Sequence, residues 1–246
     1  MAHHVRVTFS TALTDAAKRG LAVADAHRSV AKPRRDDPDI VPLTHEEVDR
    51  LLAACRDDAF EAAYVLAVTL GLREGELLGL RWQDVDLARG RLVVRGNATR
   101  DLDGSRQITG PKTRAGYRTL ILPAVCREAL MRTPRTGELV WPARDGAPVW
   151  EEVFRRRWRG MCARARIRPA TFHTLRHTAA TLALEDGTPL HVVTATLGHT
   201  KPETTARLYA HLTHPSMVAL ADAIDARFGA RLRVLPDPMR ESPEKP

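Results

Sequence analysis

The chain has 246 residues, of which 43% are hydrophobic and 28% charged, and it carries a formal net charge of +8. This composition excludes a disordered chain, and the positive charge favours a polyanionic partner, either nucleic acid or an acidic membrane surface. Three widely spaced cysteines form no Cys-x-x-Cys pair, the start of the chain has no apolar run of signal-peptide length, and no stretch approaches the length of a membrane span. We therefore expect a soluble cytoplasmic protein without a disulfide framework.

The N-terminal region is predicted to hold one helix followed by a boundary. Apolar residues recur at helical spacing across residues 10–30, although Gly20 interrupts this stretch. A charged segment bracketed by Pro33 and Pro38 then breaks the helix. We therefore expect residues 1–37 to be separate from the rest of the chain.

The next region begins with strong helix signals. Thr44 is the predicted N-cap of a helix, and Glu47, three residues on, completes a capping box. A second helix should cover residues 59–70 and end at Gly71, and a short helix should follow at 74–80.

Strands are expected in the middle of the chain and helices after it. Residues 91–95 and 118–122 have strand character and flank a glycine-containing, charged connection. Helical spacing predicts further helices at 124–132, 148–165, 174–186, 189–196, 202–211 and 215–228. The expected fold is mainly α with a small antiparallel β-sheet, an α+β class.

One predicted helix carries a cluster of basic side chains. His173, Arg176 and His177 stand at i, i+3 and i+4 and so share one helix face. Arginine suits a phosphate because its planar fork binds two oxygens and keeps its charge. A polar helix face or a zinc-binding histidine pair is the alternative, but no third ligand stands at metal spacing nearby.

Upstream residues supply two more cations. Arg73 begins the predicted short helix with Glu76 one turn on, and Lys112 lies between the two strands. Taken alone, Arg73 and Glu76 fit an exposed i,i+3 ion pair better than a catalytic pair, and Lys112 fits a solvated lysine better than a catalytic one.

Tyr209 is the candidate nucleophile. A phenol has a pKa of about 10 and attacks only where surrounding cations favour its phenolate. A core tyrosine is the alternative, but Tyr64 and Tyr117 lack a comparable cluster of histidines and arginine upstream. The whole set of arginines, histidines, lysine and tyrosine, His199 among them, favours the transfer of a phosphodiester.

These residues resemble the motifs of the tyrosine recombinase, or phage integrase, family over about residues 42–225. The matching runs are Thr69-Leu-Gly-Leu-Arg-Glu-Gly-Glu-Leu-Leu-Gly-Leu-Arg-Trp82, Lys112-Thr-Arg, His173-Thr-Leu-Arg-His177, Leu197-Gly-His199 and Tyr209-Ala-His211. The resemblance implies a tyrosine recombinase catalytic domain at residues 38–230, preceded by a remnant of the N-terminal core-binding domain and linker at 1–37. Residues 231–246 are expected to form a disordered tail.

The resemblance also implies a site-specific recombinase or integrase that works through a 3′-phosphotyrosyl intermediate without a metal or cofactor. Tyr209 would attack the phosphate, Arg73 and Arg176 would clamp it, His173 and His199 would add hydrogen bonds, Lys112 would protonate the leaving 5′-hydroxyl, and Glu76 and His177 would support the cluster. The alternatives are strand relaxation like that of a type IB topoisomerase and a DNA-binding remnant without recombination activity.

The expected partners are double-stranded DNA and further copies of the chain, with no membrane. In the family, a C-terminal helix such as 215–228 docks on a neighbouring protomer and builds a tetramer on DNA. The alternative is that its apolar stripe packs on its own domain.

Overall fold

A computed structural model describes residues 2–21, 40–101, 103–111 and 116–198. The chain divides into two units, 1–40 and 41–246, and each is described by itself. In the first unit, helix α1 runs over Ala2–Lys18, so the helix expected at 10–30 begins earlier and ends earlier. Gly20, with φ +79°, follows its end. The predicted boundary at 37/38 and the predicted tail lie outside the described residues.

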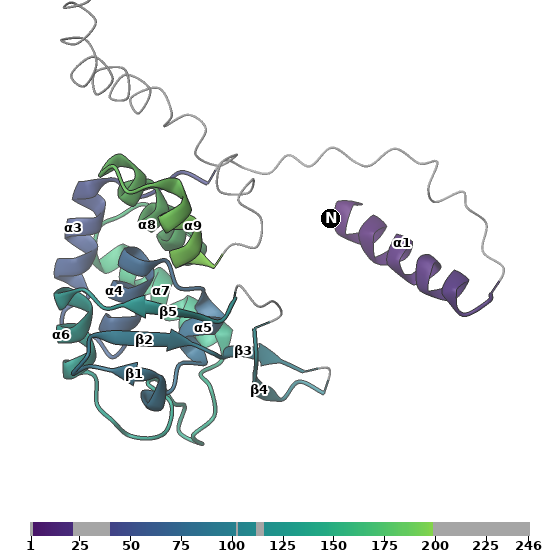
Figure 1. The fold of residues 1–246 in the computed structure, drawn as a ribbon, viewed down its shortest axis with the longest axis horizontal. Helices are drawn as coiled ribbons and strands as arrows, with labels where there is room; N and C mark the ends of the chain where they lie inside the picture. Colours follow the sequence, from purple (N-terminus) through teal and green to yellow (C-terminus); the bar gives the residue numbers. More distant parts are fainter. Residues whose placement is uncertain (1, 22–39, 102, 112–115, 199–246) are drawn as a thin grey trace, which may run out of the picture. The chain divides into compact units, whose positions relative to one another are not determined.

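The second unit combines helices with two small antiparallel sheets, which confirms the predicted fold class. Its elements in chain order are α3 (His45–Ala54), α4 (Glu61–Leu70), α5 (Glu74–Leu78), the 3-10 helix η1 (Trp82–Asp84), β1 (Val85–Asp86), β2 (Arg91–Val94), β3 (Asn97–Arg100), β4 (Arg106–Thr109), β5 (Arg118–Ile121), α6 (Ala124–Arg132), α7 (Glu151–Arg164), α8 (His173–Glu185) and α9 (Leu190–Leu197). In Figure 1, α3, α8 and α9 lie above the sheet, and the β3–β4 hairpin projects to one side. The helices expected at 202–211 and 215–228 lie outside the described residues.

The strands at 91–95 and 118–122 are confirmed as β2 and β5, and they pair antiparallel with Arg91 opposite Ile121 and Val94 opposite Arg118. The short β1 lies on the other edge of β2. The connection between β2 and β5 forms the β3–β4 hairpin, which the sequence analysis did not predict. Its strands are mostly polar, and only Ala98 among their residues is buried, so they lack the alternating pattern that marks a half-buried strand.

The start of α3 confirms the predicted capping box. The Glu47 backbone N–H donates to the Thr44 hydroxyl at 3.3 Å, and the Thr44 N–H donates to the Glu47 carboxylate at 3.0 Å. Two of the backbone N–H groups left free at a helix start are thereby satisfied.

Helix α4 lies at the centre of the core because it is apolar on all sides. Every residue of α4 except Thr69 is buried. Tyr64 contributes to an aromatic cluster with Phe154 and Trp158 of α7 and with Phe172, which precedes α8. This packing holds α7 and the start of α8 against α4, and the start of α8 carries the basic cluster.

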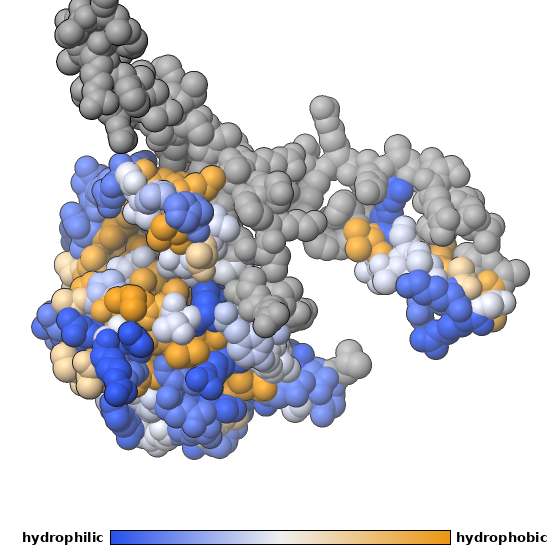
Figure 2. Space-filling model, viewed as in Figure 1, coloured by the Kyte–Doolittle hydropathy of each residue, from blue (hydrophilic) through white to orange (hydrophobic). Residues whose placement is uncertain are grey.

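The surface of the second unit is mixed. On the face seen in Figure 2, hydrophilic side chains separate small apolar areas. Exposed apolar side chains include Ile121 on β5 and Val192 on α9. Among the described residues, no helix is both long and apolar enough to cross a membrane.

Candidate active site

Arg73 and Glu76 lie at the start of α5, where the chain turns sharply after α4. Gly71 ends α4 in the left-handed region at φ +66°, a conformation that glycine adopts without strain. The Arg73 backbone N–H donates to Glu76 Oε2 at 2.9 Å, and its side-chain Nη1 donates to Oε1 at 2.8 Å. Glu76 is only 6% exposed, whereas the Arg73 side chain is 37% exposed. The pair is therefore half-buried, unlike the exposed ion pair that the sequence allowed.

Arg118 is a site residue that the sequence analysis missed. Its Nη1 and Nη2 donate to Glu76 Oε1 and Oε2 at 2.9 and 2.8 Å, and its side chain is 7% exposed. Along β5, Arg118 shares the inward face with buried Leu120, since alternate residues of a strand face the same side. A charged residue at an inward strand position requires a buried partner of opposite charge. The inward position of Arg118 was therefore the feature of the sequence that could have indicated its role.

The two arginines keep Glu76 ionised. Burial alone would raise the pKa of the Glu76 carboxyl. The hydrogen bonds and charge of Arg118, followed by those of Arg73, outweigh burial and lower this pKa to about 2. The carboxylate is therefore charged at every pH at which the protein would normally work.

Arg176 of α8 is almost fully buried. It is 3% exposed. Its Nη1 donates to the Gly71 carbonyl at 2.6 Å, and its Nη2 donates to the Leu197 carbonyl at 2.7 Å. One guanidinium thus ties the end of α4 to the end of α9.

The C-terminal end of α9 accepts hydrogen bonds from Arg73, Arg118 and Arg176. Thr196 O accepts from Arg118 Nε at 2.7 Å. Leu197 O accepts from Arg176 and also from Arg73 Nη1 at 3.5 Å, and Gly198 O accepts from Arg73 Nη2 at 3.3 Å. These carbonyls lack partners within their own helix and carry the negative end of its dipole. The helix end therefore holds the cations close together.

The two histidines of α8 lie against each other, with ring centroids 4.8 Å apart and an interplanar angle of 80°. His173 reaches the surface, but partial desolvation, then the charges of His177 and Arg176, lower its pKa to about 4. Burial, then Arg176, also lowers the pKa of His177. His173 is therefore neutral at pH 7. Among residues 2–21, 40–101, 103–111 and 116–198, no group of three potential ligands is placed to hold a metal.

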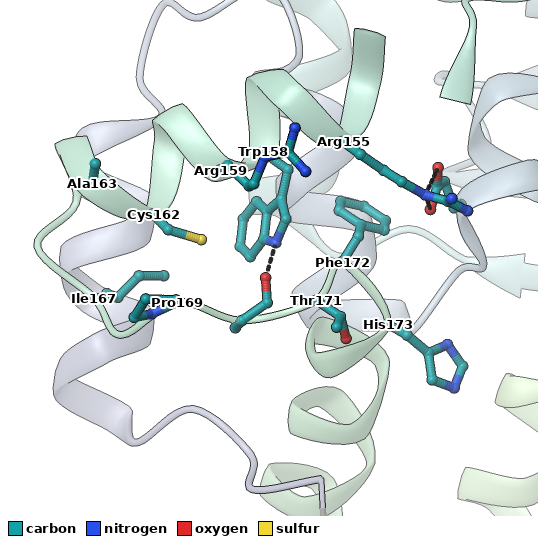
Figure 3. Close-up of a pocket in the computed structure, with 12 residues that line it drawn as sticks. Arg155, Trp158, Arg159, Cys162, Ala163, Ile167, Pro169, Thr171, Phe172 and His173 are labelled. Carbon is teal, nitrogen blue, oxygen red and sulfur yellow. Dashed lines mark hydrogen bonds and ion pairs between the residues drawn. The ribbon is translucent and has the colours of Figure 1, made fainter. Parts of the chain in front are cut away.

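An apolar pocket of about 770 Å³ adjoins His173 and is lined by α7 and the segment before α8. In Figure 3, His173 and Arg155 lie at one end of this pocket and Cys162 at the other. The Trp158 indole N–H donates to the Ala170 carbonyl at 2.7 Å. That bond fixes the segment that leads into His173.

A second pocket, which we call the polar pocket, opens beside Arg73 and His173. It has a volume of about 590 Å³ and is lined by Leu72, Arg73, Glu74, Gly75, Asn97, Ala98, Thr99, Arg100, Glu151, Arg155, Phe172 and His173. Arg155 is held there by Glu74 at 3.0 Å and by Glu151 at 2.9 Å. Arginine side chains from the N-cap of α5, from β3 and from α7 therefore face one concave surface, as expected for an anion-binding site.

The structure thus brings together Arg73, Glu76, Arg176 and the two histidines of α8. The other three predicted site residues, Lys112, His199 and Tyr209, lie outside the described residues, and their roles stay predictions. Of the other tyrosines, Tyr64 is buried in the core, which raises the pKa of its hydroxyl. Tyr117 is 54% exposed beside Arg118.

The arrangement of helices and small sheets is that of tyrosine recombinase catalytic domains. A solved structure of the Tn1549 transposon integrase with transposon right end DNA matches with a TM-score of 0.71 and 21% identity, covering 89% of this chain and 76% of that one. A lambda integrase tetramer bound to a Holliday junction matches with a TM-score of 0.58 and 20% identity, covering 84% and 58%. At such identities the likeness shows the fold alone.

The chain belongs to the phage integrase family, whose sequence model matches residues 42–215. A XerC-like tyrosine recombinase of Caldanaerobacter subterraneus is 27% identical over 202 residues, which is 72% of this chain and 51% of that protein. The chain spans about half the length of the curated relatives that it matches first.

Proposed function

We propose that the chain carries the catalytic domain of a site-specific DNA recombinase or integrase, which cleaves and rejoins DNA through a 3′-phosphotyrosyl intermediate. Family membership supports this function. The single observation that carries it is the convergence of Arg73 and Arg176 on Leu197 O, two residues before His199. Two permanent cations at one point suit a phosphate with two non-bridging oxygens.

In the proposed step, the Tyr209 oxygen bonds to phosphorus as the bond to the 5′ oxygen breaks. The phenol gives up its proton to the solvent, and Lys112 supplies one to the departing 5′ oxygen, which leaves as a 5′-hydroxyl. Arg73 and Arg176 balance the charge that develops on the phosphate. The reverse attack by a 5′-hydroxyl rejoins the strand, so the bond energy is conserved and the reaction takes no metal or nucleotide cofactor.

Neighbouring groups support these roles. His173, neutral at pH 7, would donate a hydrogen bond to a phosphate oxygen, and His199 would donate another. Glu76 and His177 would hold the cluster in place. We assign catalysis to residues 38–230, with residues 1–37 as part of a core-binding domain and linker and 231–246 as a tail.

The proposed substrate is double-stranded DNA, bound by a homotetramer. The Tn1549 and lambda integrase structures contain DNA, and the latter is a tetramer. Segment 215–228 would dock on the neighbouring copy. Unchanged assembly on DNA after deletion of the residues beyond Pro215 would refute that docking.

A suicide duplex that traps the covalent intermediate tests the function. Tyr209→Phe should abolish the adduct and leave DNA binding near the wild-type level, because only the nucleophilic oxygen is lost. Tyr117→Phe is the matched control and should trap normally, since Tyr117 is exposed but not the proposed nucleophile. Adduct formation by Tyr209→Phe would exclude Tyr209.

Two other outcomes separate the alternatives. Relaxation of supercoiled plasmid without any strand exchange would indicate an activity like that of a type IB topoisomerase. A gel shift without an adduct on any substrate would indicate a DNA-binding remnant.

A further inference from the structure

The Glu76 carboxylate is fully occupied by two arginines. Oε1 accepts from Arg118 Nη1 at 2.9 Å and Arg73 Nη1 at 2.8 Å. Oε2 accepts from Arg118 Nη2 at 2.8 Å and the Arg73 backbone N–H at 2.9 Å. A carboxylate offers about four lone-pair sites, so both its position and its orientation are fixed. Any change in Arg118 is therefore transmitted to Arg73.

Arg118 is itself fixed from two further directions. Its Cα lies in β5 opposite Val94, and its Nε donates to Thr196 O at 2.7 Å in the last turn of α9. The neighbouring carbonyls of Leu197 and Gly198 accept from Arg73. Arg118 therefore contacts both groups that hold the Arg73 guanidinium, namely the Glu76 carboxylate and the end of α9.

From this geometry we infer that Arg118 is a positioning residue for the proposed strand-cleavage reaction, acting on Arg73 through Glu76 and the end of α9. The inference rests on the proposed function. Arg118 need not touch the substrate, because its three side-chain nitrogens already bind Glu76, Thr196 and Gly116. Its contribution is to keep Glu76 ionised and correctly oriented beneath Arg73.

The test is the rate of covalent adduct formation on a suicide duplex, measured against pH on the full chain. Arg118→Gln removes the group that contributes most to keeping Glu76 ionised. The variant should react at least about 10-fold more slowly at pH 7, because Arg73 loses its orientation. Its rate should also fall on acidification at a pH about one unit or more above that of the wild type, since the pKa of Glu76 rises.

Two further variants make the result specific. Arg118→Lys keeps the charge but loses the two-pronged fork, so it should react more slowly than wild type. Its loss of rate on acidification should be shifted less than that of Arg118→Gln. The control Arg95→Gln removes an arginine that pairs with Asp84 at 3.3 Å and is 63% exposed, and it should react like wild type. Duplex affinity, measured alongside, should be unchanged in all three.

The outcomes separate this inference from the proposed function. A wild-type chain that formed no adduct would overturn both. A reactive wild type, together with wild-type rates and pH profiles in both Arg118 variants, would overturn the positioning role alone. Loss of folded protein with an unchanged rate and pH profile per folded molecule would assign Arg118 a purely structural role. If Arg118→Gln does not fold, Arg118→Lys decides by its rate.

Discussion

The guanidinium groups of Arg73 and Arg176 share one acceptor, the carbonyl oxygen of Leu197, at 3.5 and 2.7 Å. Arg73 lies at the start of α5, and Arg176 lies in α8. Two cations at one point repel each other unless a negative group lies between them. The end of α9 supplies that group, so the spacing of the arginines depends on where α9 ends.

Arg176→Gln should destabilise the protein and stop the reaction. The shorter, uncharged side chain leaves at least one of the Gly71 and Leu197 carbonyls without its donor. The free energy of unfolding should fall by about 2–4 kcal/mol, and adduct formation should fall by about 100-fold or more. Urea unfolding and trapping measure the two effects. Arg89→Gln, at a side chain that is 78% exposed, should change neither. Wild-type stability in Arg176→Gln would contradict the buried geometry.

Glu76 should make the stability of the protein depend on acid pH. Its pKa is lowered from 4.5 to about 2 in the folded protein, so its stabilising contribution is complete above about pH 5 and is lost as pH falls toward 2. This contribution amounts to about 3 kcal/mol. Urea unfolding of the wild type and of Glu76→Gln at pH 5 and pH 3 measures it.

Between those two pH values, Glu76→Gln should lose less stability than the wild type, because it lacks the titrating group. Glu138→Gln is the control, since Glu138 forms an exposed ion pair with Arg81 and should follow the wild type. Equal pH dependence in all three proteins would show that Glu76 is not held ionised by its partners.

Gly71→Ala should displace the end of α9. A Cβ at Gly71 would lie 2.3 Å from Leu197 Cδ2, and the residue has φ +66°. Gly187→Ala is the matched control, because Gly187 follows α8 with φ +82° and has no atom within 4 Å of its added Cβ. Gly187→Ala should cost only the backbone strain, about 1 kcal/mol. Gly71→Ala should cost more and also slow adduct formation. Equal costs would mean that Leu197 moves aside freely.

The proposed binding of DNA should depend steeply on salt, because each phosphate contact releases counterions. Arg100 lines this pocket and its side chain is 62% exposed. In Arg100→Gln, the slope of log K against log salt should become shallower by about 1. Arg89→Gln, outside the pocket, should keep the wild-type slope. A flat salt response of the wild type would count against a DNA partner.

Local sequence patterns predicted several helix ends and strands correctly. The capping box at Thr44, the end of α4 at Gly71 and the strands β2 and β5 follow from short-range patterns, and all are confirmed. The β3–β4 hairpin escaped prediction because its stability comes from packing beside α5, where Gly75 and Gly79 leave room for Asn97 and Ala98, and not from its own apolar content.

The sequence indicated which residue types form the site, but not how deeply their side chains are buried or which groups they contact. Arg73 and Arg176 stand out in the sequence as cations, but the burial of Arg176 results from contacts with residues 105 and 21 positions away. Arg118 was missed for the same reason. Its strand position indicates that it needs a buried partner, but only the fold shows that the partner is Glu76.

The crowding of arginines around α9 has a thermodynamic consequence. Thr196, Leu197 and Gly198 present their carbonyl oxygens whether or not an anion is nearby. The work of assembling like charges is therefore done when the chain folds, and in the proposed reaction an incoming phosphate would meet cations that are already oriented. Little reorganisation energy then remains in the reaction step.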